Sequence, residues 1–88
     1  MNEINDVEYL EYIVRGIVNV PDAVSVERTT DDRGVLMSIR VDQSDMAIVI
    51  GRAGAVAQSL RTLMRIVGKK SNALISVKVL EPEGGVPQ

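Results

Sequence analysis

The sequence contains no cysteine and no histidine. Without cysteine the protein has no disulfide, thiolate zinc site or thiol nucleophile, and without histidine it lacks the imidazole of most acid–base and triad chemistry. The carboxylates that remain are scattered along the chain, with no glycine-rich nucleotide loop beside them. We therefore expect a binding protein rather than an enzyme, with no metal site and no cofactor.

Aromatic residues are almost as scarce. Tryptophan and phenylalanine are absent, and the only aromatic residues, Tyr9 and Tyr12, both lie near the N-terminus. RNA-recognition motifs and OB-folds stack bases on aromatic side chains of a sheet, so this composition argues against both folds. We expect the two tyrosines to contribute to packing or to a dimer contact.

Long hydrophobic runs are also missing, because no apolar segment approaches the about 18 residues of a membrane-spanning helix. The first six residues are acidic where a signal peptide would be basic, so we expect a cytoplasmic protein. The chain of 88 residues, 45% hydrophobic and 25% charged, has room for one folded domain. We expect this domain to span residues 1–80, with residues 81–88 as a flexible tail.

The charge is divided between the two halves of the chain, although the net charge is only −2. Residues 1–45 carry four arginines against ten acidic residues, a net charge of −6, whereas residues 46–80 carry six basic residues and no acid. A basic half beside an acidic half is typical of a protein that binds a polyanion on one side only. Chance segregation in a short chain is the alternative.

The N-terminal half of the chain has the pattern of a helix followed by a hairpin. Asn5 and Glu8 have the spacing of a capping box, and apolar residues then recur every three or four positions, which predicts a helix over residues 6–19. Residues 24–27 and 35–42 alternate between apolar and polar on either side of a turn containing Asp and Gly. This alternation predicts a hairpin with one buried face.

The C-terminal half predicts two helices and a strand. Ser44 is placed to cap a short helix over residues 45–50, and a longer helix starts near Ala55. Its predicted inward stripe consists of Val56, Leu60, Leu63, Met64 and Val67. A last strand alternates over residues 75–80. The whole predicts an α+β fold of order α-β-β-α-α-β, with a three-stranded sheet covered on one face by three helices.

A turn with two glycines, Gly51-Arg52-Ala53-Gly54, separates the two predicted helices. Backbone amides at the start of a helix have no intrahelical partner, so they can donate to phosphate oxygens, aided by the helix dipole. Glycines let a sugar–phosphate chain approach closely, and Arg52 can contact a phosphate without reading a base. Because Gly-x-x-Gly is common in turns, the spacing alone is weak evidence.

The context of this turn resembles the KH-domain family, whose signature is an apolar pair, a Gly-x-x-Gly with a basic residue inside it, and an amphipathic helix. Residues 48–67 match that signature. The element order is similar to the type II KH arrangement up to about residue 80. More narrowly, a lone domain of this size, with Pro21-Asp22-Ala23-Val24 and the Leu60-Arg61 pair, resembles the small bacterial KhpA family.

The resemblance implies that the turn clamps the backbone of about four nucleotides of single-stranded RNA. The bases would lie in an apolar groove between the second and third helices and the second strand, with Arg40 at its edge. The residues implied in RNA binding are Ile48, Val49, Ile50, Gly51, Arg52, Ala53, Gly54 and Arg40. We expect at least one of the three apolar residues to belong to the core. Ala53 stands where the family often has a second polar or basic side chain, which predicts weak, sequence-tolerant binding.

Arg61 and Arg65 lie four residues apart on the predicted third helix, away from its inward stripe. One interpretation is a solvated surface. The other is a contact with more distant phosphates, because both arginines follow the turn within the segment that has no acid.

The family resemblance further implies an RNA chaperone or post-transcriptional regulator. It also implies a homodimer, or a pair with a larger KH-containing protein of the KhpB (Jag) type. The alternative is a KH fold used as a protein-interaction module without direct RNA contact, which the overall acidity and the single basic residue of the turn favour.

Overall fold

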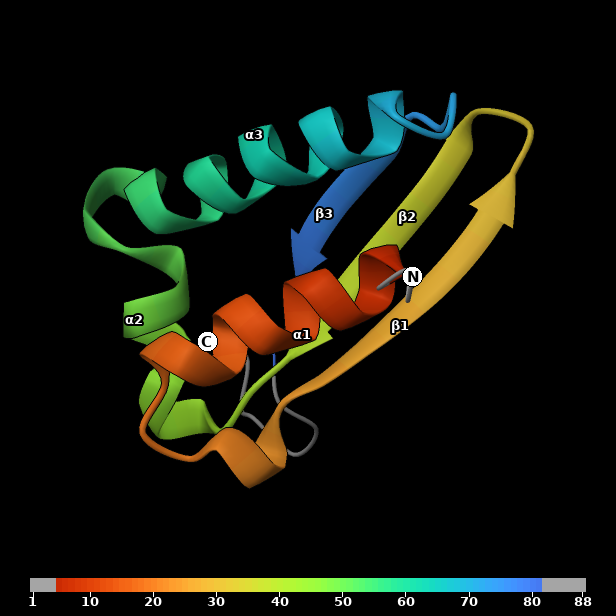
Figure 1. Ribbon diagram of the computed structural model, residues 1–88. Coiled ribbons are helices and arrows are strands. Elements are labelled where there is room, and N and C mark those ends of the chain that lie inside the picture. The colour runs from red at the N-terminus through yellow and green to blue at the C-terminus, as the bar shows by residue number, and fades with distance from the viewer. Residues whose placement is uncertain (1–4, 82–88) are drawn as a thin grey trace.

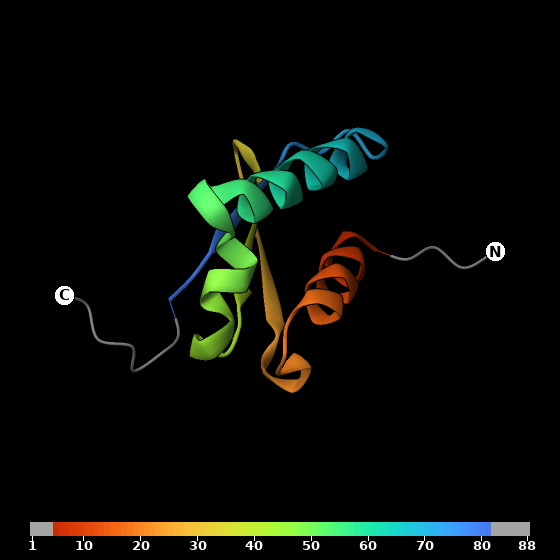
Figure 2. The same ribbon diagram turned by 90° about the vertical axis from the view of Figure 1, so that its left-hand side faces the viewer.

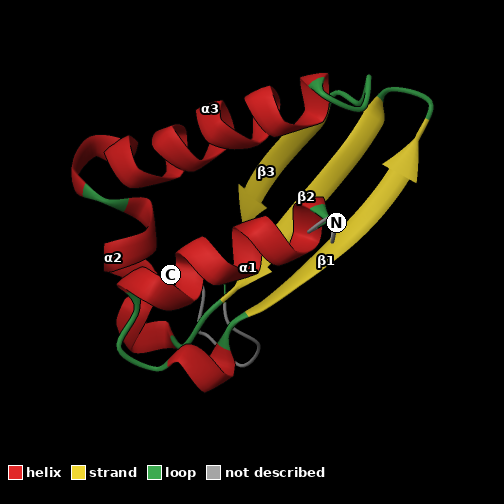
Figure 3. Cartoon of the chain, viewed as in Figure 1, coloured by secondary structure: helices red, strands yellow, loops and turns green. Residues whose placement is uncertain are grey.

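The computed structural model describes residues 5–81, and most of the predicted tail, residues 82–88, lies outside them. The α-helices are α1 (Asp6–Ile17), α2 (Met46–Ile50) and α3 (Ala55–Lys69), and the strands are β1 (Ser25–Asp31), β2 (Gly34–Arg40) and β3 (Ile75–Val79). Three short 3-10 turns occupy Pro21–Ala23, Gln43–Asp45 and Arg52–Gly54. The predicted α+β fold and its element order are confirmed (Figure 3).

The sheet is mixed and has the strand order β1-β2-β3 (Figure 1). β1 and β2 are antiparallel across a tight turn, with Asp31 opposite Gly34, whereas β2 and β3 are parallel, with Val35 opposite Ile75. A parallel pair needs a long crossover connection, which α2 and α3 supply here. Within the described residues, β3 is therefore an edge strand with one side unpaired.

One face of the sheet is covered and the other is open. Val35, Met37 and Ile39 of β2 are buried, whereas Leu36 and Arg40, which point to the opposite face, are exposed. Figures 1 and 2 show α1 and α3 across the covered face, with α2 near one end of the sheet. The core is Leu10, Val14, Val24, Val35, Met37, Ile39, Val41, Val49, Leu60, Met64, Ile75 and Val77.

The capping box of α1 forms as predicted, but the helix ends two residues early. The amide of Glu8 donates to Oδ1 of Asn5 at 2.8 Å, and the amide of Asn5 donates to Oε1 of Glu8 at 3.2 Å. Helix α1 ends at Ile17 rather than at residue 19, because Val18 is already extended. The backbone that follows passes close to the start of α2, where Asn19 and Val20 donate to Asp45.

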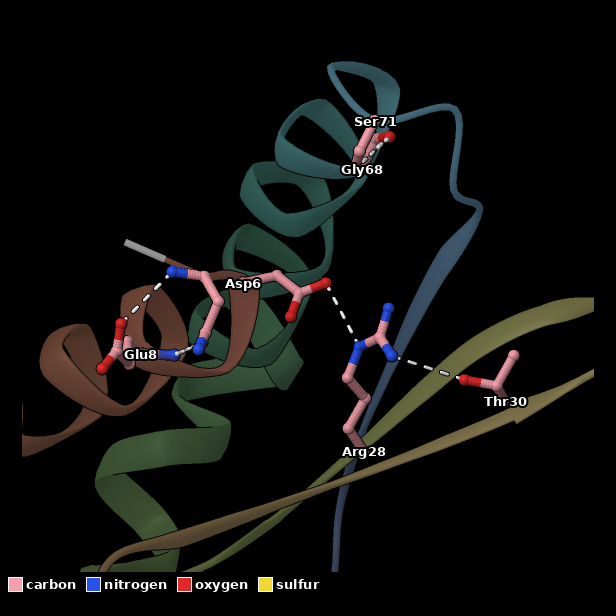
Figure 4. A network of polar contacts seen from close by, with 7 residues as sticks. Asp6, Glu8, Arg28, Thr30, Gly68 and Ser71 are labelled. Atoms are coloured by element: carbon pink, nitrogen blue, oxygen red, sulfur yellow. Dashed lines mark hydrogen bonds and ion pairs between the residues drawn. The ribbon is translucent and has the colours of Figure 1, made fainter. Parts of the chain in front are cut away.

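Strand β1 is longer than its sequence pattern predicts. The ladder with β2 continues to Asp31, although Arg28 and Thr30 interrupt the apolar alternation on the helix-facing side. Arg28 is satisfied there, because its Nε donates to Oδ2 of Asp6 at 3.3 Å and its Nη1 to the hydroxyl of Thr30 at 3.5 Å (Figure 4). The ion pair thus joins α1 to β1.

The inward face of α3 differs in part from the predicted stripe. Leu60 and Met64 are buried as expected, together with Ala57, but Leu63 is 46% exposed. The buried positions follow one line on the helix, and Leu63 lies on its flank. The prediction for Leu63 is therefore wrong, and with Ile66, which is 56% exposed, it gives α3 an exposed apolar surface.

Candidate nucleic-acid interface

Gly51 is required by the fold. The turn between α2 and α3 passes through left-handed backbone, and Gly51 has a φ of 78°. A Cβ atom there would lie 2.5 Å from Cγ2 of Val56 and 2.6 Å from its backbone nitrogen. No other residue fits this position without moving the start of α3.

Gly54 is different, because within residues 5–81 the space that its side chain would occupy is open. Its φ is also 78°, but a Cβ atom added there would meet no atom within 4 Å. Other residues can adopt this left-handed conformation at a cost of about 1–2 kcal/mol, so packing does not demand glycine here. The missing side chain leaves the backbone at the N-terminus of α3 open to a ligand.

Two backbone amides of the turn are free to donate. The amide of Gly54 donates to the carbonyl oxygen of Gly51 at 3.1 Å, and that of Ala55 donates to the carbonyl of Arg52. The amides of Arg52 and Ala53 have no acceptor within residues 5–81. Together with the exposed side chain of Arg52, they form a group of donors at the positive end of α3 that suits a phosphate.

A buried carboxylate holds the start of α2. Asp45 is fully buried, and its Oδ1 and Oδ2 accept the amides of Asn19 at 3.1 Å and Val20 at 3.0 Å. This pair of bonds fixes the segment after α1 to the beginning of α2, and so helps to position the glycine turn. The sequence around Asp45 does not indicate this role, since the partners are backbone amides 26 and 25 residues away.

The predicted cap of α2 by Ser44 is wrong, because Asp42 caps the 3-10 turn Gln43–Asp45 and α2 follows that turn without a side-chain cap. Oδ2 of Asp42 accepts the hydroxyl of Ser44 at 2.6 Å and the amide of Ser44 at 3.0 Å. The hydroxyl bond first, and then the amide bond, lower the pKa of the Asp42 carboxyl below its ordinary value. Ser44 is thus the donor in this cap and Asp42 the acceptor.

The three apolar residues of α2 have different positions. Val49 is fully buried, which confirms that one of the three belongs to the core. Its side chain packs in the hydrophobic core and is not available to a ligand. Ile48 is half-buried and Ile50 is 38% exposed. Of these three residues, Ile48 and Ile50 can present apolar surface beside the glycine turn.

Arg40 lies on the face of the sheet opposite the helices, across from Ser25. Its neighbour Ile39 is buried under the helices, so Arg40 points away from α3, and the strand in closest contact with α3 is β3. The predicted position of Arg40 at the edge of a groove beside α3 is therefore wrong. Edge strand β3 borders this side of the interface instead.

Arg61 and Arg65 also differ from each other. Nε of Arg61 donates to the carbonyl oxygen of Val77 at 3.1 Å, and its Nη1 to Oε1 of Gln58 at 3.4 Å. Arg61 is thus half-buried against β3 rather than part of a solvated surface. Arg65, one turn further along α3, is exposed.

Two further features follow from the described part of the chain. Residues 5–81 contain no group of three or more acidic side chains arranged to hold a metal ion. None of their helices has the length and apolar character needed to cross a membrane.

The sequence is similar to proteins of one family, KhpA/KhpB. A sequence model for the KH domain of KhpA/KhpB matches residues 7–79. The RNA-binding protein KhpA of Borreliella burgdorferi is 31% identical over 77 residues, which cover 88% of this chain and 94% of that protein. The RNA-binding protein KhpA of Mycobacterium bovis is 44% identical over 62 residues, which cover 70% of this chain and 78% of that protein.

A solved structure shares the fold. The crystal structure of Aquifex aeolicus Era bound to GDP.AlF4- superposes with a TM-score of 0.61 at 13% identity, covering 92% of this chain. This chain spans only 32% of that protein's length, and the likeness concerns the fold alone. The family match extends from α1 to the end of β3 and includes the glycine turn. The chain therefore belongs to the KhpA/KhpB KH-domain family.

Proposed function

We propose that the chain binds single-stranded RNA at the glycine turn, which clamps the sugar–phosphate backbone. The observation that carries this proposal is the pair of free amides of Arg52 and Ala53, beside the open position of Gly54. The two relatives described above are named RNA-binding proteins, which favours RNA as the polyanion. The guanidinium of Arg52 supplies the positive charge of the clamp.

The bases then lie beside the clamp, on the apolar surface that Ile48 and Ile50 offer between α2, α3 and β3. Only Arg52 carries a charge in the turn, and the small side chain of Ala53 adds no polar contact. Binding by one domain is therefore weak and tolerant of sequence. The protein acts in the cytoplasm as an RNA chaperone or post-transcriptional regulator. Its family is one of RNA-binding KH domains rather than enzymes, in agreement with the lack of cysteine and histidine.

A domain that holds about four nucleotides gains affinity by joining a second domain, since linked sites raise the effective concentration. The partner is a second copy of this chain or a KhpB (Jag)-type protein. Exposed apolar side chains are available for such a contact: Leu63 and Ile66 on α3 and Tyr12 on α1, which is 81% exposed. Sedimentation velocity of wild type and of Leu63→Gln/Ile66→Gln tests this proposal, because loss of a dimer in the variant supports an α3 contact.

The same exposed apolar surface favours a second candidate function, that of a protein-interaction module without RNA contact. A substitution at Gly54 distinguishes the two candidate functions. In the first, a side chain at Gly54 removes binding of RNA, whereas in the second it changes nothing. Gly16 on α1 offers a matched control, because it is exposed and a Cβ atom there also meets no atom within 4 Å.

The experiment compares wild type, Gly54→Asp and Gly16→Asp by fluorescence anisotropy with a labelled, unstructured RNA of about twelve nucleotides. Both variants add the same charge and should remain folded in thermal unfolding. We expect Gly54→Asp to weaken binding at least about tenfold, a change of about 1.4 kcal/mol, and Gly16→Asp to bind like wild type. Equal RNA binding by all three proteins would contradict an RNA clamp at the glycine turn and favour the protein-interaction module.

A further inference from the structure

The two flanks of α3 carry different chemistry. Arg61, Arg65 and Lys69 follow one another four residues apart on one flank, whereas Leu63 and Val67 lie on the other. The bond from Nε of Arg61 to the carbonyl of Val77, at 3.1 Å, fixes the orientation of the basic flank. This flank therefore lies over the side where β3 ends the sheet.

The basic flank is a continuation of the glycine turn. Arg61 lies two turns beyond Gly54, roughly 10 Å along the helix axis, and each further basic residue follows after about 6 Å. Such a step is comparable with the separation of neighbouring phosphates in an extended strand. Arg65 and Lys69 are exposed, and neither forms an ion pair within residues 5–81.

The opposite side of the molecule repels a polyanion. Helix α1 exposes Glu8, and strand β1 exposes Glu27 and Asp31, whereas the segment from α2 to β3 contains no acidic residue. An RNA strand that leaves the turn thus meets a favourable potential along α3 and an unfavourable one toward α1 and β1.

We propose that RNA continues from the clamp along the basic flank of α3, with successive phosphates at Arg61, Arg65 and Lys69. This inference rests on the proposed function. It defines the ligand as a single-stranded tract several nucleotides longer than the about four held by the turn. It also gives Arg61 two tasks: part of its guanidinium holds the edge of β3, and the remaining N–H groups face the RNA.

The test compares Arg65→Gln/Lys69→Gln with the matched control Arg15→Gln/Arg33→Gln, which removes the same charge from the acidic half. Arg61 is left unchanged because of its bond to Val77. In the described part of the chain, the one ion pair of Arg15 is an exposed contact with Glu11 at 3.7 Å, so the control variant should fold normally. Each protein is titrated over a range of salt concentrations with two unstructured RNAs, of about four and about twelve nucleotides.

Removal of two phosphate contacts should reduce the slope of log K against log salt for the longer RNA by about 1.4, with the shorter RNA unaffected. The control variant should keep the slope of wild type for both RNAs. For the longer RNA, an unchanged salt slope in Arg65→Gln/Lys69→Gln, or an equal reduction in both variants, would contradict the proposal that RNA follows α3.

If the proposed RNA clamp itself is wrong, the titrations give a different result. In that case wild type fails to bind either RNA, or Gly54→Asp still binds the short RNA like wild type. If Gly54→Asp loses the short RNA while Arg65→Gln/Lys69→Gln behaves like the control, then the clamp is retained and only the path along α3 is wrong.

Discussion

Gly51 approaches Val56 so closely that a Cβ atom at residue 51 would lie 2.6 Å from the backbone nitrogen of Val56. The two glycines of the turn therefore differ, because a Cβ atom at Gly54 would lie in open space. We predict that Gly51→Ala lowers the free energy of unfolding by about 2–4 kcal/mol, from steric overlap added to left-handed backbone strain. Urea denaturation measures this loss.

Gly54→Ala is the comparison, since Gly54 shares the φ of 78° and lacks the steric overlap, with a ψ of 14° against 170° at Gly51. It should cost only about 1–2 kcal/mol. Equal losses at both positions would contradict the packing of Gly51 against Val56. A substitution of both glycines together would mix unfolding with loss of binding, which is why Gly54 alone is the useful site for binding experiments.

Ala53 is strained, because it has a left-handed φ of 55° without being glycine. Asparagine adopts this conformation more readily than alanine, so Ala53→Asn should raise the free energy of unfolding by about 0.5–1 kcal/mol. The same substitution at Ala47, within α2, should lower it by a similar amount because asparagine is a poorer helix former. Two losses of equal size would show that Ala53 is not strained in solution.

Asp45 is the only acceptor that the structure gives to the amides of Asn19 and Val20 within residues 5–81. Asp45→Ala leaves these amides without an acceptor, and it should lower the free energy of unfolding by about 2–4 kcal/mol. Asp22→Ala, at an exposed position, should change it by less than about 0.5 kcal/mol. If both variants unfold at the same urea concentration, Asp45 does not hold the start of α2.

Asp42 has a lowered pKa because of the bonds from Ser44. A carboxyl with a lowered folded-state pKa stabilises the protein above its unfolded pKa, and this contribution is lost as the pH falls through the folded value. Ser44→Ala removes the hydroxyl bond, so it should raise the pKa of Asp42 toward that of an ordinary aspartate. NMR titration of the Asp42 carboxyl measures the shift. An unchanged pKa would show that the hydroxyl bond is not formed in solution.

The sequence predicted the element order well because most elements carry local signals. The capping box of Asn5 and Glu8 and the alternation around Met37 depend on neighbouring residues, and both formed as expected. The family resemblance rested on the turn at residues 51–54, and the family match confirms it. Residues 1–4 and 82–88 lie outside the described part of the chain, so the single-domain boundary and the flexible tail stay predictions.

Two roles that the sequence did not reveal depend on contacts between distant segments. Nothing near Asp45 in the sequence indicates that it binds backbone amides beyond α1, and nothing near Arg61 indicates the carbonyl of Val77. Arg40 was misplaced for another reason: the alternation along residues 35–42 already puts it on the face opposite Met37 and Ile39. The individual site residues stay predictions until binding is measured.

The measurement that tests the clamp most directly is an NMR titration of the backbone amides with a short single-stranded RNA. The amides of Arg52 and Ala53 have no acceptor among residues 5–81, and those of Asn19 and Val20 already donate to Asp45. We predict downfield amide-proton shifts at Arg52 and Ala53, as they donate to phosphate, with Asn19 and Val20 unchanged. Shifts confined to other parts of the surface, with Arg52 and Ala53 unaffected, would contradict RNA binding at the glycine turn.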